Sequence, residues 1–274
     1  MATAKPKIAI TNVSRVYDLG KEKFYALKDV SLQMGEAEFV TVVGPSGCGK
    51  STMMNLLAGL DRPTLGTAEV DGKIVDGPSP DRGVIFQQYA LFPWLTVRQN
   101  VEFGLKSNKE ISKAERREIA EHFINMVGLT QFADSLPKTL SGGMKQRCAI
   151  ARAYAVNPSI LLMDEPFGAL DALTRVQLQS QLLDAWSQDK RTVMFITHDV
   201  DEAVFLANRV VIMAARPGRI YDIVPIDLPY PRDDDMRLSP EFAQLRNRIW
   251  QGVYHQDPDH TYTGPIGPLP SENL

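Results

Sequence analysis

The sequence predicts an α/β fold built around a parallel β-sheet, and three observations support this. A glycine-rich octet at residues 44–51 lies between the apolar run 39–43 and a helix-like stretch at 52–58. A second apolar run, residues 160–163, has the unbroken hydrophobic character of a strand buried on both faces. Residues 172–188 then carry apolar side chains at helical spacing. Strands that alternate with helices along a chain indicate a parallel sheet covered by helices.

The N-terminal region predicts a second kind of sheet. Residues 8–17, 26–34 and 39–43 are rich in β-branched side chains and alternate between apolar and polar types. We expect these strands to form an antiparallel flap that presents Tyr17 beside the core.

From residue 91 to about residue 138 the pattern changes to helices. Ser112 and Glu115 have the spacing of a capping box, in which each side chain binds the backbone N–H of the other residue. This pattern predicts a helical lobe, about residues 91–150, inserted into the α/β core. The face that the capped helix is expected to bury consists of Ile119, Phe123, Met126 and Val127.

The rest of the chain predicts a helix at 172–188, strands at 193–197 and 210–214 that complete the sheet, and a terminal helix at 239–255. An acidic run at 233–235 is expected to form a solvated turn. The buried side chains expected for the two helices are Leu178, Leu182 and Trp186 in the first, and Phe242, Leu245, Ile249 and Trp250 in the second. Residues 258–274, rich in Pro, Gly and polar types, are expected to be disordered.

Composition narrows the functional class. A chain of 274 residues that is 44% hydrophobic can bury a full core. Its formal charge of −3, without any basic block, argues against a general nucleic-acid binder. The two cysteines, Cys48 and Cys148, lie in unrelated segments, which favours a reducing cytoplasm over a disulfide. No apolar run is long enough to cross a bilayer and the N-terminus lacks a secretion signal, so we expect membrane association only through a partner.

The glycine-rich octet has the chemistry of a phosphate cradle. After a strand, a chain that turns sharply and points successive N–H groups at oxygens needs glycines. Lys50 is expected to reach the outer phosphates, and Ser51 to offer a hydroxyl to Mg²⁺ at the positive end of the following helix. The predicted ligand is a nucleoside triphosphate. The residues expected to bind it are Gly44, Pro45, Ser46, Gly47, Cys48, Gly49, Lys50, Ser51 and Thr52.

An acidic pair follows the apolar run 160–163. Ligands of open parallel sheets bind beyond the carboxyl ends of strands, which would bring both carboxylates to the phosphates. Asp164 suits a water-mediated hold on Mg²⁺, and Glu165 suits a general base for the water that attacks the γ-phosphate. Taken alone, the pair reads more simply as two polar residues at a strand end.

A second anion-binding surface is predicted at Ser141, Gly142 and Gly143, where a hydroxyl and two glycines precede a helix. These residues, within the stretch 140–147, resemble the Leu-Ser-Gly-Gly-Gln signature of ATP-binding cassette proteins. Met144 stands where glutamine is commonest, and we interpret it as a family variant. In that family two cassettes pack head to tail, and the signature of one closes on the ATP held by the other. The resemblance therefore implies that a monomer is not the competent form.

Four further residues resemble functional positions of the family. Gln87 resembles the glutamine that binds Mg²⁺ and senses the γ-phosphate, although Gln88 is adjacent. His198 resembles the switch histidine, while a lone histidine at a strand end is more often structural. Asp171 resembles the residue that orders the dimer interface, and a plain helix N-cap is compatible with that role. Tyr17 resembles the aromatic residue that stacks on adenine; candidates with weaker support are Phe24 and Tyr25.

The resemblance covers nearly all of residues 8–255 and implies an ATPase domain at 8–230 with a helical extension at 231–257. Three phrases, at 91–97, 166–171 and 215–220, are similar to the nitrate, sulfonate and taurine branch of bacterial importers, which also contains bicarbonate-type systems. Residues 89–94 resemble the groove that receives a helix of the membrane subunit, while packing inside the helical lobe is the alternative.

The family implies a set of partners and a location. The partners are a second cassette, identical or paralogous, a transmembrane permease, and indirectly a periplasmic binding protein; the location is the cytoplasmic face of the inner membrane. Two other interpretations compete. A soluble cassette ATPase acting on nucleic acid or ribosomes usually carries two cassettes or basic linkers, and a P-loop kinase or GTPase needs no Ser-Gly-Gly signature. The chain has neither paired cassettes nor the guanine-reading Asn-Lys-x-Asp tetrapeptide.

Overall fold

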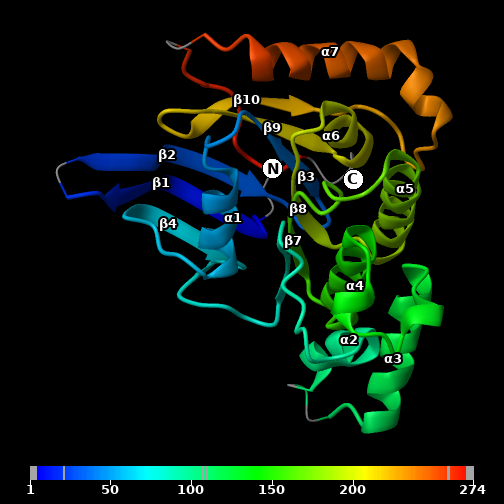
Figure 1. Cartoon of the computed structure of the whole chain (residues 1–274). Coiled ribbons are helices and arrows are strands. Elements are labelled where there is room, and N and C mark those ends of the chain that lie inside the picture. The colour runs from blue at the N-terminus through cyan, green and yellow to red at the C-terminus, as the bar shows by residue number, and fades with distance from the viewer. Residues whose placement is uncertain (1–4, 21, 107, 109, 258–259, 270–274) are drawn as a thin grey trace. The chain divides into compact units, whose positions relative to one another are not determined.

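The computed structural model describes residues 5–20, 22–106, 108, 110–257 and 260–269 (Figure 1). The chain divides into two compact units. Unit 1 comprises Met1–Ser79 and Gln179–Leu274, and unit 2 comprises Pro80–Leu178. The predicted extent of the ATPase domain, residues 8–230, stays a prediction.

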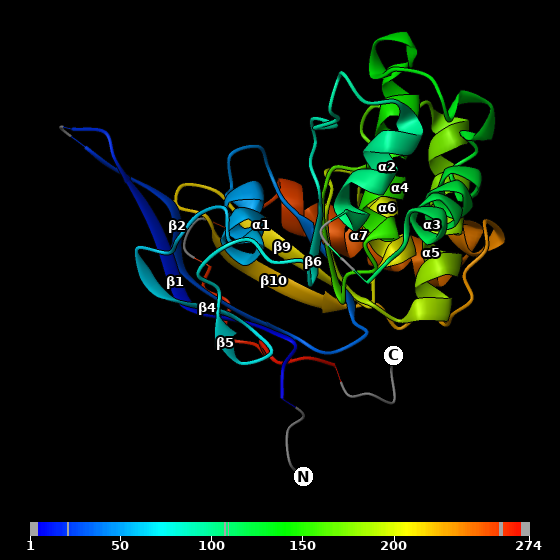
Figure 2. The same ribbon diagram turned by 90° about the horizontal axis from the view of Figure 1, so that it is seen from below.

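Unit 1 contains an antiparallel sheet with the strand order β2-β1-β4-β5 (Figure 2). Its strands are β1 (Ile8–Asp18), β2 (Lys23–Met34), β4 (Leu65–Val70) and β5 (Lys73–Ile74). The β1–β2 register shifts on both sides of Arg15, which bends the strand just before Tyr17. The antiparallel flap predicted from the N-terminal strands is therefore present.

The second sheet of unit 1 is built around β3 (Phe39–Val43), which is buried along its whole length. It pairs in parallel with β8 (Thr192–Ile196) and with β9 (Arg209–Ala214). A fourth strand, β10 (Arg219–Pro225), pairs antiparallel with β9 and was not foreseen. Because β3 lies between two parallel strands, its assignment to the flap was wrong; it carries the continuous apolar pattern of a central parallel strand.

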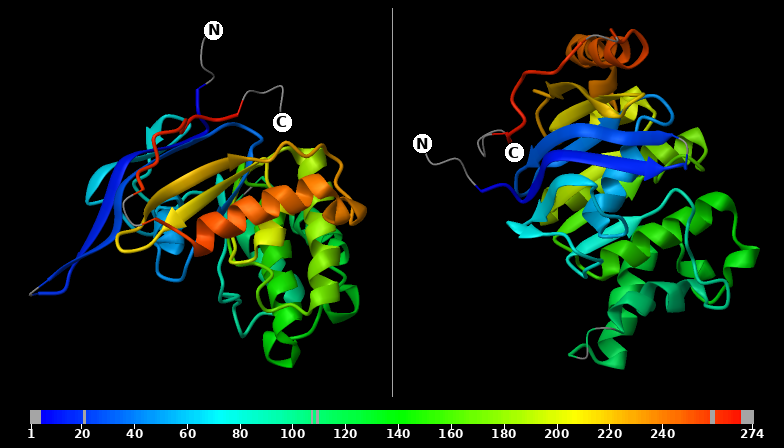
Figure 3. Two further views of the ribbon diagram at one scale, coloured as in Figure 1. Left: turned by 90° about the horizontal axis from the view of Figure 1, so that it is seen from above. Right: turned by 90° about the vertical axis from the view of Figure 1, so that its left-hand side faces the viewer.

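The described helices of unit 1 are α1 (Lys50–Ala58), α6 (Val200–Leu206) and α7 (Pro240–Tyr254), with a 3-10 turn at Asp235–Leu238. The long helix α5 (Ala172–Asp189) crosses into unit 1 from unit 2. Ser239 caps α7 by accepting a hydrogen bond from the backbone N–H of Phe242, and α7 packs along β9 and β10 (Figure 3).

The stripes predicted for α5 and α7 are confirmed in part. Leu178, Leu182 and Trp186 are buried, and the Trp186 ring packs edge-on against Phe39 with centroids 5.8 Å apart. In α7, Phe242 and Ile249 are fully buried, but Trp250 is 46% exposed. Trp250 is exposed because the helical face that contains Phe242 and Ile249 directs position 250 away from the sheet.

Unit 2 joins a parallel strand pair to a helical lobe. Strand β6 (Arg82–Ile85) pairs in parallel with β7 (Ile160–Asp164). The helices are α2 (Val97–Leu105), α3 (Lys113–Met126) and α4 (Gly142–Ala155), with 3-10 turns at Thr130–Phe132 and Pro137–Thr139. These helices pack on one another and form the predicted lobe (Figure 1).

Helix α3 begins with the capping box that the sequence predicts: Ser112 accepts from the N–H of Glu115, and Glu115 accepts from the N–H of Ser112. Its buried face differs from the predicted one. Ala120, Ile124 and Val127 are buried, whereas Ile119, Phe123 and Met126 are half-buried. The buried stripe that starts at Ala120 is therefore shifted by one residue from the predicted one.

The described part of the C-terminal segment, residues 260–269, makes hydrogen bonds to other parts of unit 1, and the disorder predicted for residues 258–274 stays a prediction. The Gln33 N–H donates to the Ile266 carbonyl at 2.8 Å, and the Arg209 guanidinium donates to the Gly267 carbonyl at 2.5 Å. Because β2 is an edge strand, the segment covers backbone groups that would otherwise face solvent. The parts of the predicted tail at 258–259 and 270–274 lie outside the described residues.

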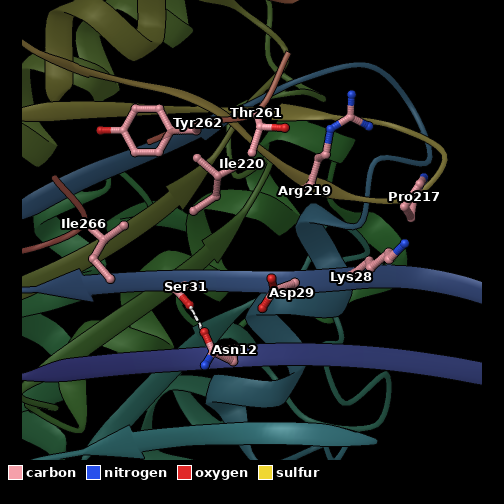
Figure 4. A pocket seen from close by; sticks show the side chains of 10 residues that line it. All are labelled: Asn12, Lys28, Asp29, Ser31, Pro217, Arg219, Ile220, Thr261, Tyr262 and Ile266. Carbon is pink, nitrogen blue, oxygen red and sulfur yellow. Dashed lines mark hydrogen bonds between the residues drawn. The ribbon is translucent and has the colours of Figure 1, made fainter. Parts of the chain in front are cut away.

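This segment also lines one side of a hollow of about 450 Å³ in unit 1. In Figure 4, Tyr262, Thr261 and Ile266 lie on one side of the hollow, and Asn12 and Ser31 lie on the other, joined by a hydrogen bond of 2.9 Å. Among the described residues, no helix combines the length and apolar character that crossing a membrane requires.

Candidate functional site

The phosphate loop of unit 1 connects the buried strand β3 to helix α1. Gly49 caps α1 in the left-handed region, with φ 91°. A Cβ at this position would lie 2.6 Å from Leu27 Cδ2 and 2.7 Å from the Ala26 carbonyl oxygen. Gly47, with φ 76°, faces open space. Only glycine is compatible with position 49, because both its backbone conformation and its packing exclude a side chain.

Lys50 is held at the mouth of this loop. Its ammonium donates to the Gly44 carbonyl at 2.7 Å and to the Pro45 carbonyl at 3.1 Å, and the residue is 8% exposed. A loop with successive backbone N–H groups, a buried cation and a helix N-terminus is suited to phosphate oxygens. The neighbouring Cys48 is fully buried; burial raises the pKa of its thiol, although Lys50 opposes the shift.

His198 follows β8, the parallel neighbour of β3. Val42 pairs with Ile196, so the phosphate loop and His198 leave the carboxyl ends of adjacent strands. The Thr197 hydroxyl donates to Glu202 at 2.5 Å and accepts from the Asp199 N–H at 3.0 Å. These bonds fix the backbone around His198, while its side chain is exposed.

Tyr17, the predicted adenine-stacking residue, is half-buried on β1. Its hydroxyl donates to Asp61 Oδ2 at 2.9 Å, and the Arg15 guanidinium carbon lies 4.4 Å from the ring centroid. The alternatives, Phe24 and Tyr25, are 48% and 42% exposed on β2. Arg15 and Asp61 were missed by the sequence analysis; the signal that could have found Arg15 is its two-residue spacing from Tyr17.

In unit 2 the structure brings together two of the predicted residues. Because β6 and β7 are parallel neighbours, Gln87 and Glu165 leave the same edge, and Gln87 Nε2 donates to Glu165 Oε2 at 3.0 Å. Glu165 has φ 46°, an uncommon value for a residue other than glycine and one that concentrates at functional sites. Asp164, the last residue of β7, is 8% exposed.

The signature residues form the start of α4. The Ser141 side chain accepts from the Met144 N–H at 3.2 Å and so caps the helix. A Cβ at Gly142 would lie 2.9 Å from the Tyr89 hydroxyl, and one at Gly143 would lie 2.9 Å from Leu170 Cδ2. Both glycines therefore allow neighbouring segments of unit 2 to approach α4 closely.

Asp171 acts as a helix cap. Its carboxylate accepts from the Thr174 N–H at 3.0 Å, and hydrogen bonds from Thr174 lower the pKa of this carboxyl. The capping interpretation of Asp171 is thus confirmed, and a role at a dimer interface stays a prediction.

Unit 2 also contains a groove with a volume of about 370 Å³ beside the Gln87 segment. Phe86, Phe92 and Phe103 supply much of its apolar lining. Arg152 of α4, another residue that the sequence analysis missed, donates to the Ala90 carbonyl at 2.6 Å and shapes the groove. Trp94, 71% exposed, packs its ring near Phe92 with centroids 5.7 Å apart.

Residues 27–168 match the ABC transporter family. The chain belongs to this family. It is 68% identical over 254 residues to an ATP-binding protein of Brucella abortus (strain 2308), a match that covers 93% of this chain and 96% of that protein. As members of the family do, this ABC protein binds and hydrolyses ATP in connection with transport, and its fold is the mixed α/β fold of the ABC cassettes.

Two relatives whose names state a cargo have lower sequence identity to this chain. The nitrate import ATP-binding protein NrtD of Synechocystis is 50% identical over 248 residues, covering 88% of this chain and 93% of NrtD. The bicarbonate transport ATP-binding protein CmpD of the same organism is 46% identical over 266 residues, covering 93% and 94%. The solved dimeric structure of a bacterial ABC transporter cassette aligns with a TM-score of 0.75 at 38% identity, covering 80% of this chain and 98% of that one.

Proposed function

We propose that this ABC protein is the ATP-hydrolysing subunit of an importer that takes up a small anion of the nitrate, sulfonate, taurine or bicarbonate type through a separate membrane permease. The observation that carries the proposal is the likeness to nitrate and bicarbonate ATP-binding proteins, at 50% and 46% identity over most of both chains. The anion itself would be bound by the permease and by a periplasmic binding protein.

The roles that we propose in hydrolysis are given for each unit by itself. In unit 1, Lys50 and the backbone N–H groups of Gly44 and residues 46–52 would hold the phosphates and offset the charge that develops on them. In unit 2, Glu165 would polarise the attacking water, and the hydrogen bond from Gln87 orients its carboxylate. His198 would contact the γ-phosphate.

Mg²⁺ is the implied metal, and the donors suit it. Ser51, Gln87 and Asp164 each offer an oxygen, the ligand type that Mg²⁺ prefers. Once bound, the ion would neutralise charge on the phosphates. Asp164 is the last residue of the buried strand β7, so the strand fixes the position of its backbone.

The signature residues support a dimer. Ser141, Gly142 and Gly143 stand at the N-terminus of a 14-residue helix, a position that favours anions. We propose that they close on ATP held by the phosphate loop of a second cassette, with Asp171 at that interface. A bacterial cassette of 38% identity has been solved as a dimer, which supports the proposal.

The groove of unit 2 would receive the permease. Its aromatic lining and the exposed Trp94 offer apolar contact area, and Arg152 holds the backbone that shapes it. Bound to the permease through this groove, the ATPase subunit would lie at the cytoplasmic face of the inner membrane without a membrane span of its own.

The hydrolytic assignment is tested by Glu165→Gln. The variant should keep its ATP affinity and lose about 10²- to 10⁴-fold in turnover, because the substitution removes the base and retains the shape. ATP should then trap the dimer, which sedimentation can measure. Exposed Glu118, changed to Gln, is the matched control in the same unit and should behave as wild type. Wild-type turnover in Glu165→Gln would refute the assignment.

The transport assignment is tested separately. The protein should co-purify with a polytopic permease encoded beside it, and the reconstituted complex should take up labelled nitrate, bicarbonate or taurine only with hydrolysable ATP. Co-purification with RNA or DNA in place of a permease would overturn it.

A further inference from the structure

The Tyr17 ring is contacted on two sides by residues with no assigned role. Its hydroxyl donates to Asp61 Oδ2 at 2.9 Å, and the guanidinium of Arg15 lies over the ring, 4.4 Å from its centroid. A cation over an aromatic face is attracted by the negative potential of that face. The hydrogen bond and the cation together restrict both the tilt and the position of the ring.

Arg15 and Asp61 also bind each other directly. Arg15 Nε donates to Asp61 Oδ2 at 2.8 Å, and Arg15 Nη2 lies 2.8 Å from Asp61 Oδ1. Such a two-point guanidinium–carboxylate pair fixes the geometry of both groups. The side chains of Arg15 and Asp61 are 24% and 22% exposed. The pair therefore adds little to the free energy of folding as a surface ion pair, and its main effect is to hold both groups in place beside Tyr17.

The Asp61 carboxylate is saturated with donors. It accepts from the Arg15 guanidinium, the Tyr17 hydroxyl and the backbone N–H of Arg62, the last at 2.8 Å. Partial burial alone would raise the pKa of Asp61, but these hydrogen bonds outweigh it and hold the pKa below the ordinary value. The carboxylate is therefore charged and in place throughout the neutral range.

The location of Asp61 connects this cluster to the phosphate loop. Asp61 follows α1, the helix that starts at Lys50, and its N–H donates back to the Asn55 carbonyl of that helix at 3.3 Å. Three residues on, Thr64 Oγ1 accepts from the Val16 N–H at 3.0 Å. The segment after α1 is thus hydrogen-bonded to β1 at Arg15, Val16 and Tyr17, so the phosphate loop and Tyr17 are both connected to helix α1.

We propose that Arg15 and Asp61 are positioning residues that hold Tyr17 in the orientation required to stack on the base of the bound nucleotide, with the guanidinium, the ring and the base forming a stack of three. This rests on the predicted role of Tyr17 in stacking on adenine. The guanidinium covers one face of the ring, which leaves the opposite face for the base. None of the three groups reads the edge of a base, so the cluster favours nucleotides over base-free phosphates and accepts any purine.

The test compares two probes, ATP and inorganic tripolyphosphate, each with Mg²⁺, by calorimetry on the full chain. Arg15→Ala should weaken ATP binding about threefold to thirtyfold, since it removes the cation–ring contact and the support of Asp61. Tripolyphosphate binding should not change, because the phosphate loop is untouched. Asp61→Asn should act in the same direction, and Arg15→Lys should restore part of the loss.

A matched control lies in the turn between β4 and β5. Asp71 pairs with Lys7 at 2.9 Å and touches none of the three residues, so Asp71→Asn should leave both affinities unchanged. If Arg15→Ala weakens ATP and tripolyphosphate equally, the residue acts on the fold or the phosphate loop and the proposal is wrong. Thermal unfolding of each variant separates loss of fold from loss of stacking.

A double-mutant cycle separates this proposal from the function on which it depends. Tyr17→Ala should weaken ATP about fivefold to 150-fold and leave tripolyphosphate unchanged. In that background Arg15→Ala should add nothing. If Tyr17→Ala has no effect on ATP, the stacking assignment fails. If Tyr17→Ala has its effect but Arg15→Ala adds to it in full, stacking stands and the positioning role fails.

Discussion

The phosphate loop of unit 1 and the signature loop of unit 2 both present glycines at the start of a helix, yet they are built differently. The phosphate loop brings its own cation, Lys50, which its carbonyls hold in a buried position. In the signature loop, Ser141 faces solvent and uses its hydroxyl to cap α4. The first loop therefore contains a cation of its own, whereas the second is an exposed helix end.

The glycines of the two loops differ in the same way. Gly49 is required by its backbone conformation and by the Ala26 carbonyl beside it, both properties of unit 1 itself. Gly143 has no left-handed backbone, and an added Cβ there would come within 4 Å of Leu170 Cδ2, at the flexible end of a side chain, as its one contact with other segments of the described chain. The contrast predicts that a side chain costs more stability in the phosphate loop than in the signature loop.

The largest expected effect concerns Lys50. Lys50→Ala should reduce ATP turnover by about 10²- to 10³-fold, because it removes the one preorganised cation of the loop at the phosphates. Ser141→Ala should reduce turnover less and only at protein concentrations where the dimer forms. Steady-state ATPase assays over a range of protein concentrations measure both. The exposed Lys73→Ala is the control, and equal, concentration-independent losses in the two loop variants would break the comparison.

The glycines give the next effect. Gly49→Ala should lower the free energy of unfolding by about 1 to 3 kcal/mol, since it combines a left-handed backbone with contacts below 3 Å. Gly143→Ala, in the first turn of α4, should change it by less than about 1 kcal/mol in either direction. Urea denaturation of the matched pair gives both values. A larger loss in Gly143→Ala would mean that the signature loop is as constrained as the phosphate loop.

Much of this contrast could be predicted from sequence, because the motifs are local. The octet 44–51 and the acidic pair at 164–165 can be recognised in the sequence from their residue types and spacing. The structure places each at a strand end. The Gln87–Glu165 hydrogen bond joins residues 78 positions apart and follows from β6 and β7 being parallel neighbours.

What the sequence did not reveal depends on long-range pairing. Nothing near Tyr17 in the chain points to Asp61, 44 residues away, because the contact arises where the segment after α1 returns to β1. The C-terminal segment has the polar, Pro- and Gly-rich composition that predicts disorder. Its Ile266 carbonyl nevertheless accepts a hydrogen bond from Gln33 on the edge strand β2. Composition alone does not show that an edge strand elsewhere in the fold offers unpaired backbone groups to such a segment.

The C-terminal segment gives a third, smaller effect, confined to unit 1. Glu38 and Arg209 form a fully buried ion pair at 2.8 Å; burial raises the pKa of Glu38, and bonds from Arg209, Gly35 and the Leu269 backbone oppose the shift. Deleting residues 257–274 exposes this pair and removes the Gly267 contact. Stability should fall by about 1 to 2 kcal/mol. Hydrogen exchange should increase around β2 and β9 and stay unchanged in α2, α3 and α4; increased exchange in the lobe would contradict the assignment of the segment to unit 1.

The smallest effect compares one cysteine from each unit. Cys48 and Cys148 are both fully buried, and burial raises the pKa of each thiol, that of Cys148 to about 12. At pH 8 a thiol with that pKa is ionised in only about one molecule in ten thousand, and the thiolate is the reactive form. Iodoacetamide should therefore leave ATP turnover unchanged, with no labelling at either site by mass spectrometry. Under partial denaturation the two sites report on different units, and labelling of Cys48 before Cys148 would show that the phosphate loop, and not the signature helix, is the first to open.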